Sequence, residues 1–129
     1  RQSIREFGCN AVLDAVTPII ETIRQQCFII SFDTDILAAA KNAGWKKIAP
    51  VLSSYQQAFS PTMAALDPPL IFCDNDLLSK KNSLRNLPFP AAIYEIADYQ
   101  QAAALINQGA ALVETFCIGE LIAADQPST

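Results

Sequence analysis

Short runs of apolar residues recur along the chain and give its clearest pattern. Each run is bounded by polar residues, proline or glycine. Continuous apolar runs of this length are typical of parallel strands that are covered on both faces. The sequence therefore predicts strands of one curved parallel sheet over residues 27–32, 47–52, 91–96 and 112–115, with a further apolar run at 70–73.

The region before the first strand is predicted to be helical. Ser3 and Glu6 have the spacing of a capping box, which predicts a short helical turn at the start of the chain. Pro18 falls within the helical stripe that follows. It fits either the first position of a helix capped by Thr17 or a kink in a longer helix. The stripe consists of Val12, Leu13, Val16, Ile19, Ile20 and Ile23.

Helical patterns also separate the predicted strands. Asp33, with Thr34, and Asp98 stand where N-caps are expected, and Gly44 and Gly109 stand just past the predicted helix ends. The predicted helices cover residues 35–43, 56–66 (with a proline near the middle) and 99–108.

The alternation of helix and buried strand predicts an α/β fold with parallel (β/α) repeats. An open doubly wound sheet and part of a barrel both satisfy this order. Residues 74–90 are expected to form one long loop with at most a helical turn, and residues 125–129 a disordered tail. The length of 129 residues suits a single domain, 1–129.

The composition argues against some kinds of partner and favours one cellular compartment. Hydrophobic residues make up 51% of the chain, yet no run approaches the ~20 apolar residues of a membrane-spanning helix. A net charge of −4 argues against nucleic acid as the main partner. The four scattered cysteines lack metal-site spacing and there is no histidine, so we expect reduced, mostly buried thiols in a cytoplasmic protein.

The candidate chemistry lies at the ends of the predicted strands. Ser31 and Phe32 end the first strand, where side chains can line a pocket. Glu95 and Glu114 end the last two strands, where each either faces solvent or is paired in a site. Together these two acids suit a divalent cation or a basic partner, and a structural ion pair with Arg85 is an equal alternative.

The order of these segments resembles the glycerophosphodiester phosphodiesterase family. Residues 29–33 (Ile-Ile-Ser-Phe-Asp) are similar to the family's Ser-Ser-Phe strand. Residues 93–98 (Ile-Tyr-Glu-Ile-Ala-Asp) lie where the family has Val-Trp-Thr-Val-Asn-Asp, and residues 109–115 (Gly-Ala-Ala-Leu-Val-Glu-Thr) resemble its closing Gly-Val-Asp-Gly-Ile-Ile-Thr. The opening residues look like those that follow strand four in a bacterial branch. The resemblance covers essentially the whole chain.

The resemblance implies the C-terminal half of a TIM (β/α)₈ barrel, strands five to eight. The family's catalytic histidines and the ligands of its divalent metal, Mg²⁺ or Ca²⁺, belong to the other half, so no catalytic residue and no metal ligand is expected in this chain. The resemblance implies that this chain contributes part of the pocket wall. The residues concerned are Ser31, Phe32 and Tyr94, which stands at the family's Trp position, with Glu95 and Glu114 beside them.

The resemblance also implies an activity for the complete barrel, which would hydrolyse glycerophosphodiesters to glycerol 3-phosphate and an alcohol. This chain alone is predicted to be inactive. Half a barrel leaves two sheet edges and its inner face open, so we expect pairing with the missing N-terminal half or with a second copy. The alternative is a non-catalytic α/β binding or assembly module that lacks the catalytic half.

Overall fold

The computed structural model describes residues 2–125 and contains five parallel strands in chain order. They pair as β1–β2 and as β3–β4–β5. A bridge between Val51 and Phe72, with the Leu52 amide donating to the Phe72 carbonyl at 2.8 Å, joins the two groups. The strands are β1 (Ile29–Ser31), β2 (Ile48–Pro50), β3 (Ile71–Asp74), β4 (Ala91–Tyr94) and β5 (Leu112–Val113). A strand overlaps every predicted apolar run, but the single sheet that was expected is two short sheets joined by one bridge.

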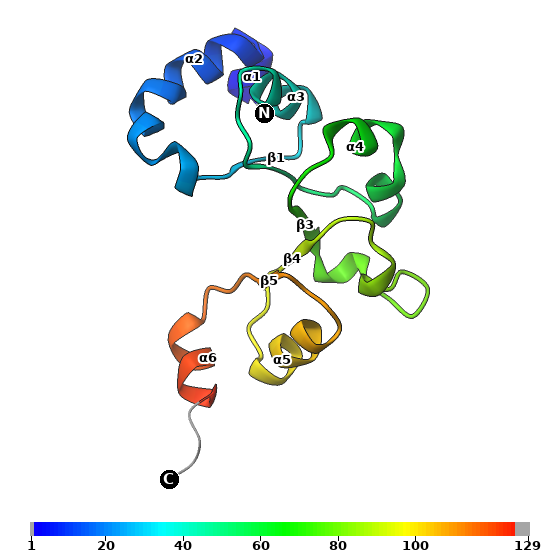
Figure 1. Ribbon diagram of the computed structural model, residues 1–129. Helices are drawn as coiled ribbons and strands as arrows, with labels where there is room; N and C mark the ends of the chain where they lie inside the picture. Colours follow the sequence, from blue (N-terminus) through cyan, green and yellow to red (C-terminus); the bar gives the residue numbers. More distant parts are fainter. Residues whose placement is uncertain (1, 126–129) are drawn as a thin grey trace.

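Helices cover one side of these strands. Figure 1 shows α3 (Thr34–Asn42), α4 (Pro61–Leu66) and α5 (Tyr99–Asn107) around the outside of an arc that the strands follow. Strand side chains at alternate positions pack outward against these helices. The main core joins Leu37 of α3 and Met63 of α4 to Ile48, Ile71 and Ile93 of the strands, all almost fully buried. The α/β prediction is confirmed.

The predicted caps of two helices are confirmed. The Asp33 carboxylate accepts from the Asp35 amide at 2.9 Å, and the Asp98 carboxylate accepts from the Gln101 amide at 2.8 Å. Gly44 and Gly109 follow the helix ends with φ of 87° and 106°. A side chain is strained in that left-handed region, which explains glycine at both positions.

The N-terminal region is helical, and one of its details differs from expectation. α1 (Gln2–Phe7) already includes Ser3, so the predicted capping box is wrong. Pro18 lies inside α2 (Cys9–Ile20), which corresponds to the longer-helix alternative. A 3₁₀ helix, η1 (Glu21–Gln26), follows α2 directly.

Two further segments differ from the sequence prediction. The helix expected over 56–66 is divided at Ser60 into η2 (Tyr55–Phe59) and α4, because the Ser60 hydroxyl accepts from the Met63 amide and Pro61 takes the first helical position. The long loop contains two 3₁₀ turns rather than one at most. These are η3 (Asn75–Leu77) and η4 (Leu84–Asn86).

The C-terminal segment contains a helix that the sequence analysis missed, α6 (Ile118–Asp125). Asp125, expected in a disordered tail, is the last residue of this helix, and the rest of that tail, 126–129, lies outside the described residues. α2 and α6 lie at the two ends of the arc (Figure 1). Among residues 2–125 no helix is long and apolar enough to cross a membrane.

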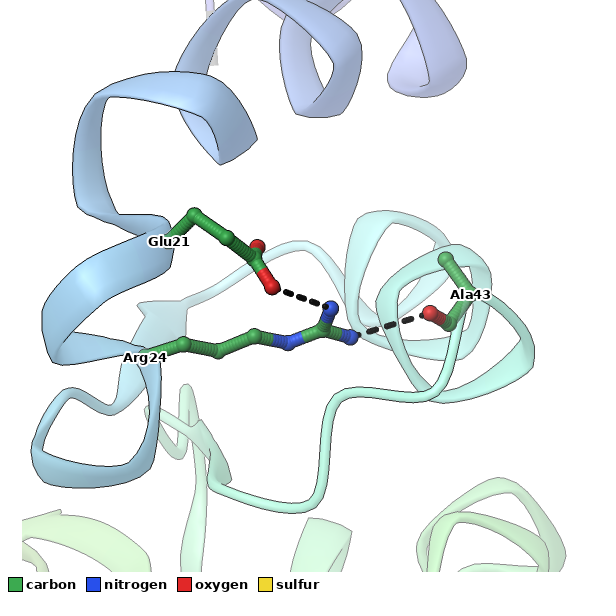
Figure 2. Close-up of polar contacts among 3 residues, drawn as sticks. All are labelled: Glu21, Arg24 and Ala43. Carbon is green, nitrogen blue, oxygen red and sulfur yellow. Dashed lines mark hydrogen bonds and ion pairs between the residues drawn. The ribbon is translucent and has the colours of Figure 1, made fainter.

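Arg24 lies near the amino ends of β1 and β2. Its guanidinium donates to the Ala43 carbonyl at 3.0 Å and pairs with Glu21 at 3.5 Å, as Figure 2 shows. The same group lies 4.5 Å from the centroid of the buried Trp45 ring. Arg24 thus fixes η1 to the C-terminal end of α3, where helix carbonyls lack partners within the helix.

The side of the strands opposite the helices is only partly covered. A small second cluster contains Ala49, Leu70 and Ala92, with Phe28 and Phe72 packed against it. On this same side Ile30 is 49% exposed and Leu112 is 54% exposed. We call this side the inner face, because it corresponds to the interior of a closed barrel.

Candidate functional site

The site lies at the carboxyl ends of the parallel strands, which meet at one edge of the sheet. An open cleft of about 500 Å³ is found there. Residues that end or follow β1, β2, β3 and β4 line it, so four separate segments contribute to one depression. Its lining residues are Phe32, Leu52, Ser53, Asp74, Leu77 and Tyr94. In parallel α/β folds ligands bind at this end of the strands.

Of the two predicted residues at the end of β1, Phe32 lines the cleft and Ser31 does not. Phe32 lines the cleft and is 45% exposed. The Ser31 hydroxyl accepts from the Asp33 amide at 3.0 Å, and Ser31 is not among the residues that line the cleft. Ser31 therefore shapes the turn that carries Phe32 into the site.

Tyr94 and Asp74 form the centre of the site. They are direct neighbours in the register of β3 and β4, and both line the cleft. The Tyr94 ring lies 6.5 Å from the Phe72 ring, centroid to centroid. Burial, and then the negative charge of Asp74, raises the pKa of Tyr94 above its ordinary value. The phenol is therefore protonated at neutral pH and able to donate a hydrogen bond.

Asp74 was not among the predicted site residues. The sequence analysis assigned no chemistry to the segment that begins with it, whereas the structure gives Asp74 two roles. Its carboxylate accepts from the Asp76 amide at 2.9 Å, which begins η3, and it also lines the cleft. The available signal was strand alternation, since Asp74 shares the side of β3 that carries Phe72.

Glu95 and Glu114 lie beside the cleft rather than in its wall. Both are exposed, and both contribute negative charge that further raises the Tyr94 pKa. Their strand ends are tied together, because the Glu114 amide donates to the Ile93 carbonyl at 2.8 Å. Within residues 2–125 neither carboxylate forms an ion pair with Arg85, so the solvent-facing alternative describes both.

The acids of this site do not fit a divalent metal ion. A metal needs several oxygen, nitrogen or sulfur ligands that converge on one point. No group of three or more acids and cysteines in the described part of the chain is arranged to hold one, and the sequence has no histidine. No metal-dependent step is therefore derived from residues 2–125.

Comparison with solved structures relates this arrangement to known enzymes, whereas no protein-family model and no curated protein sequence matches the chain. A phosphodiesterase of Oleispira antarctica, solved with the product sn-glycerol-3-phosphate, superposes with a TM-score of 0.66 at 19% identity over 96% of this chain. A glycerophosphodiester phosphodiesterase of Parabacteroides distasonis superposes with a TM-score of 0.61 at 13% identity over 92%.

The chain spans about half the length of these two structures, 51% of the first and 52% of the second. The resemblance to the glycerophosphodiester phosphodiesterases is confirmed at the level of the fold. The parallel strands and outer helices of residues 2–125 are those of a partial TIM barrel.

Proposed function

We propose that this chain supplies the C-terminal half of a glycerophosphodiester phosphodiesterase barrel. The complete barrel hydrolyses glycerophosphodiesters to glycerol 3-phosphate and an alcohol. The observation that carries the proposal is the pair of coverages, 96% of this chain against 51% of a phosphodiesterase solved with glycerol 3-phosphate. Nearly all of this chain superposes on that phosphodiesterase, whereas about half of that enzyme has no counterpart in this chain.

The distribution of exposed apolar side chains supports the same assignment. A second half-barrel would cover the inner face and the two ends of the arc. Those three places carry most of the large apolar side chains that are exposed. They are Ile30, Phe32 and Leu112 on the inner face, Phe7, Val16, Ile19 and Ile23 at the α1–α2–η1 end, and Phe116, Ile118 and Ile122 at the α6 end.

In this proposal the two halves of the barrel have different roles in the reaction. This half provides part of the pocket wall, with the Tyr94 phenol as a hydrogen-bond donor. The other half holds the divalent ion, Mg²⁺ or Ca²⁺, and the residues that transfer protons. We assign the complete enzyme to the cytoplasm, because all four cysteines are free thiols.

The chain alone is therefore expected to release no glycerol 3-phosphate. No side chain of this sequence has an unperturbed pKa near neutrality with which to serve as acid and base, since histidine is absent. The measurement is hydrolysis of glycerophosphocholine and glycerophosphoglycerol by the purified 129-residue chain, with Mg²⁺ or Ca²⁺ added. Turnover that follows the chain through every purification step would contradict the division of chemistry.

The proposal is tested by isolating the native protein. An affinity tag on this sequence in its own organism, followed by intact-mass analysis, should recover a barrel about twice the 14.0 kDa of this chain, as one longer polypeptide or two associated ones. That material should release glycerol 3-phosphate. Recovery of only self-associated copies, inactive on both substrates, would instead support the binding-module alternative.

A further inference from the structure

A second hollow, of about 550 Å³, lies at the amino ends of the strands, at the opposite end from the cleft. Two segments form it, namely η1, which precedes β1, and the loop between α3 and β2. Because both segments belong to this chain, the hollow needs no residue of a second half-barrel. Its lining residues are Glu21, Arg24, Gln25, Gly44, Lys46 and Lys47.

The lining of this hollow is basic although the chain is acidic. It contains three cations, Arg24, Lys46 and Lys47, and one carboxylate, that of Glu21. The whole chain, by contrast, has a net charge of −4. Among residues 2–125 neither lysine forms an ion pair with an acid. A concave surface lined by surplus positive charge attracts anions, so the ligand expected here is an anion.

Arg24 is held in position and still has donors available. Its Nη2 donates to the Ala43 carbonyl at 3.0 Å, and its Nη1 lies 3.5 Å from the Glu21 carboxylate (Figure 2). A guanidinium has five N–H groups, so these two contacts leave others available. The Arg24 side chain is 26% exposed, and the neighbouring Gly44 has no side chain to cover it. A positioned guanidinium with available N–H groups suits bidentate binding of an oxyanion.

The two lysines favour a phosphate group over a carboxylate. Lys46 is exposed, and Lys47 is half-buried with its Nζ 5.4 Å from the centroid of the Phe28 ring. A carboxylate has one negative charge, whereas a phosphomonoester has between one and two at neutral pH and three acceptor oxygens. Two ammonium groups beside one guanidinium match the larger charge and the additional acceptors.

We propose that the hollow lined by Arg24, Lys46 and Lys47 binds the phosphate group of a soluble phosphomonoester. The volume leaves room for an organic part beyond the phosphate, and the Gln25 amide is available to hydrogen-bond to it. This inference goes beyond the proposed function and does not depend on it, because the hollow and the cleft share no lining residue.

Binding is measured with a monoester that is not a product of the proposed reaction. Glycerol 2-phosphate is titrated into the 129-residue protein and followed by calorimetry and by amide NMR signals. The comparison ligands are dimethyl phosphate, which has one negative charge, and neutral glycerol. The second charge predicts that the monoester binds roughly fivefold more tightly than dimethyl phosphate, and glycerol should not bind. Equal affinities for the two phosphates, or amide shifts confined to Asp74 and Tyr94 in the cleft, would overturn the proposal.

Two lysine pairs of the chain provide matched variants. The double variant Lys46→Gln, Lys47→Gln removes two charges from the hollow and should weaken binding roughly tenfold. The double variant Lys80→Gln, Lys81→Gln removes two charges from exposed residues outside this lining and should leave affinity nearly unchanged. Circular dichroism checks that both variants keep the fold. Equal losses in the two variants, or full affinity in a folded Lys46→Gln, Lys47→Gln chain, would contradict the site.

Vesicles distinguish a soluble ligand from a lipid headgroup. Phosphatidic acid carries the same phosphomonoester, but an anionic membrane surface repels a chain of net charge −4. The chain should therefore stay in the supernatant when vesicles of phosphatidylcholine with phosphatidic acid are sedimented. Sedimentation with these vesicles, without binding of glycerol 2-phosphate, would assign the hollow to a lipid headgroup and overturn the soluble ligand.

Discussion

The two ends of the strands are built differently. At the amino ends a cation is used for packing, because the Arg24 guanidinium joins Glu21, the Ala43 carbonyl and the Trp45 ring. At the carboxyl ends Phe32 and Tyr94 line the cleft together with Asp74. The amino ends therefore hold a satisfied cation–π contact, and the carboxyl ends hold rings and acids without a basic residue in the cleft lining.

This difference predicts that the amino ends of the strands stabilise the fold and that the carboxyl ends bind a ligand. In a (β/α) barrel the loops at the carboxyl ends carry function and the opposite face carries stability. Substitutions of the packed side chains at the amino ends should therefore lower the free energy of unfolding and leave ligand binding in the cleft intact. Substitutions in the cleft should weaken ligand binding and leave the free energy of unfolding nearly unchanged.

The largest effect is expected at Trp45. Its side chain is 3% exposed and lies in the main core, so Trp45→Ala should lower the free energy of unfolding by about 3–5 kcal/mol. Urea unfolding followed by circular dichroism measures it. Phe116→Ala removes an aromatic ring that is 79% exposed and should cost at most about 0.5 kcal/mol. Similar losses in both variants would show that the amino ends are not the stabilising region.

The elements of the fold could be predicted because their signals are local. The buried strands appear as continuous apolar runs, and the Asp98 cap and Gly109 mark the two ends of α5 within the sequence itself. The failures have local causes too. At Ser60 a serine cap and a proline begin a new helix inside an apparently continuous helical pattern. α6 has apolar residues at helical spacing, Ile118, Leu121 and Ile122, but it is short and none of its residues is buried, so it was missed.

The site could be predicted only in part. Its position at the strand ends follows from parallel connectivity, and Phe32 and Tyr94, both named from the sequence, lie in the cleft lining. Asp74 was missed because the predicted apolar run ends at Cys73, which placed Asp74 in the following loop instead of in register with Tyr94. The aromatic contact of Phe72 with Tyr94 depends on the register between β3 and β4, which no single segment encodes.

A smaller effect is expected at Arg24. Arg24→Met keeps much of the apolar stem and removes the charge, the hydrogen bond to Ala43 and the contact with Trp45. A charged hydrogen bond to a helix-end carbonyl and a partly exposed cation–π contact together predict a loss of about 1–2 kcal/mol. Arg85→Met is the matched control, because Arg85 is exposed and its backbone amide, not its side chain, bonds to Ser83. An equal loss in both variants would remove the special role assigned to Arg24.

The smallest effect concerns the titration of Tyr94. Burial and the Asp74 charge raise its pKa, so the folded state favours the protonated phenol. This contribution to stability is complete below the ordinary tyrosine pKa of about 10 and is lost as pH rises through the higher folded value. Asp74→Asn should move the Tyr94 titration to lower pH in NMR of carbon-labelled tyrosine. Asp76→Asn, equal in charge but outside the cleft lining, should move it less, and Tyr99, whose phenol bonds to Asp125, should titrate alike in all three proteins. A Tyr94 titration that Asp74→Asn leaves unchanged would mean that the two groups do not share one cleft in solution, and the contrast between the two ends of the strands would lose its electrostatic basis.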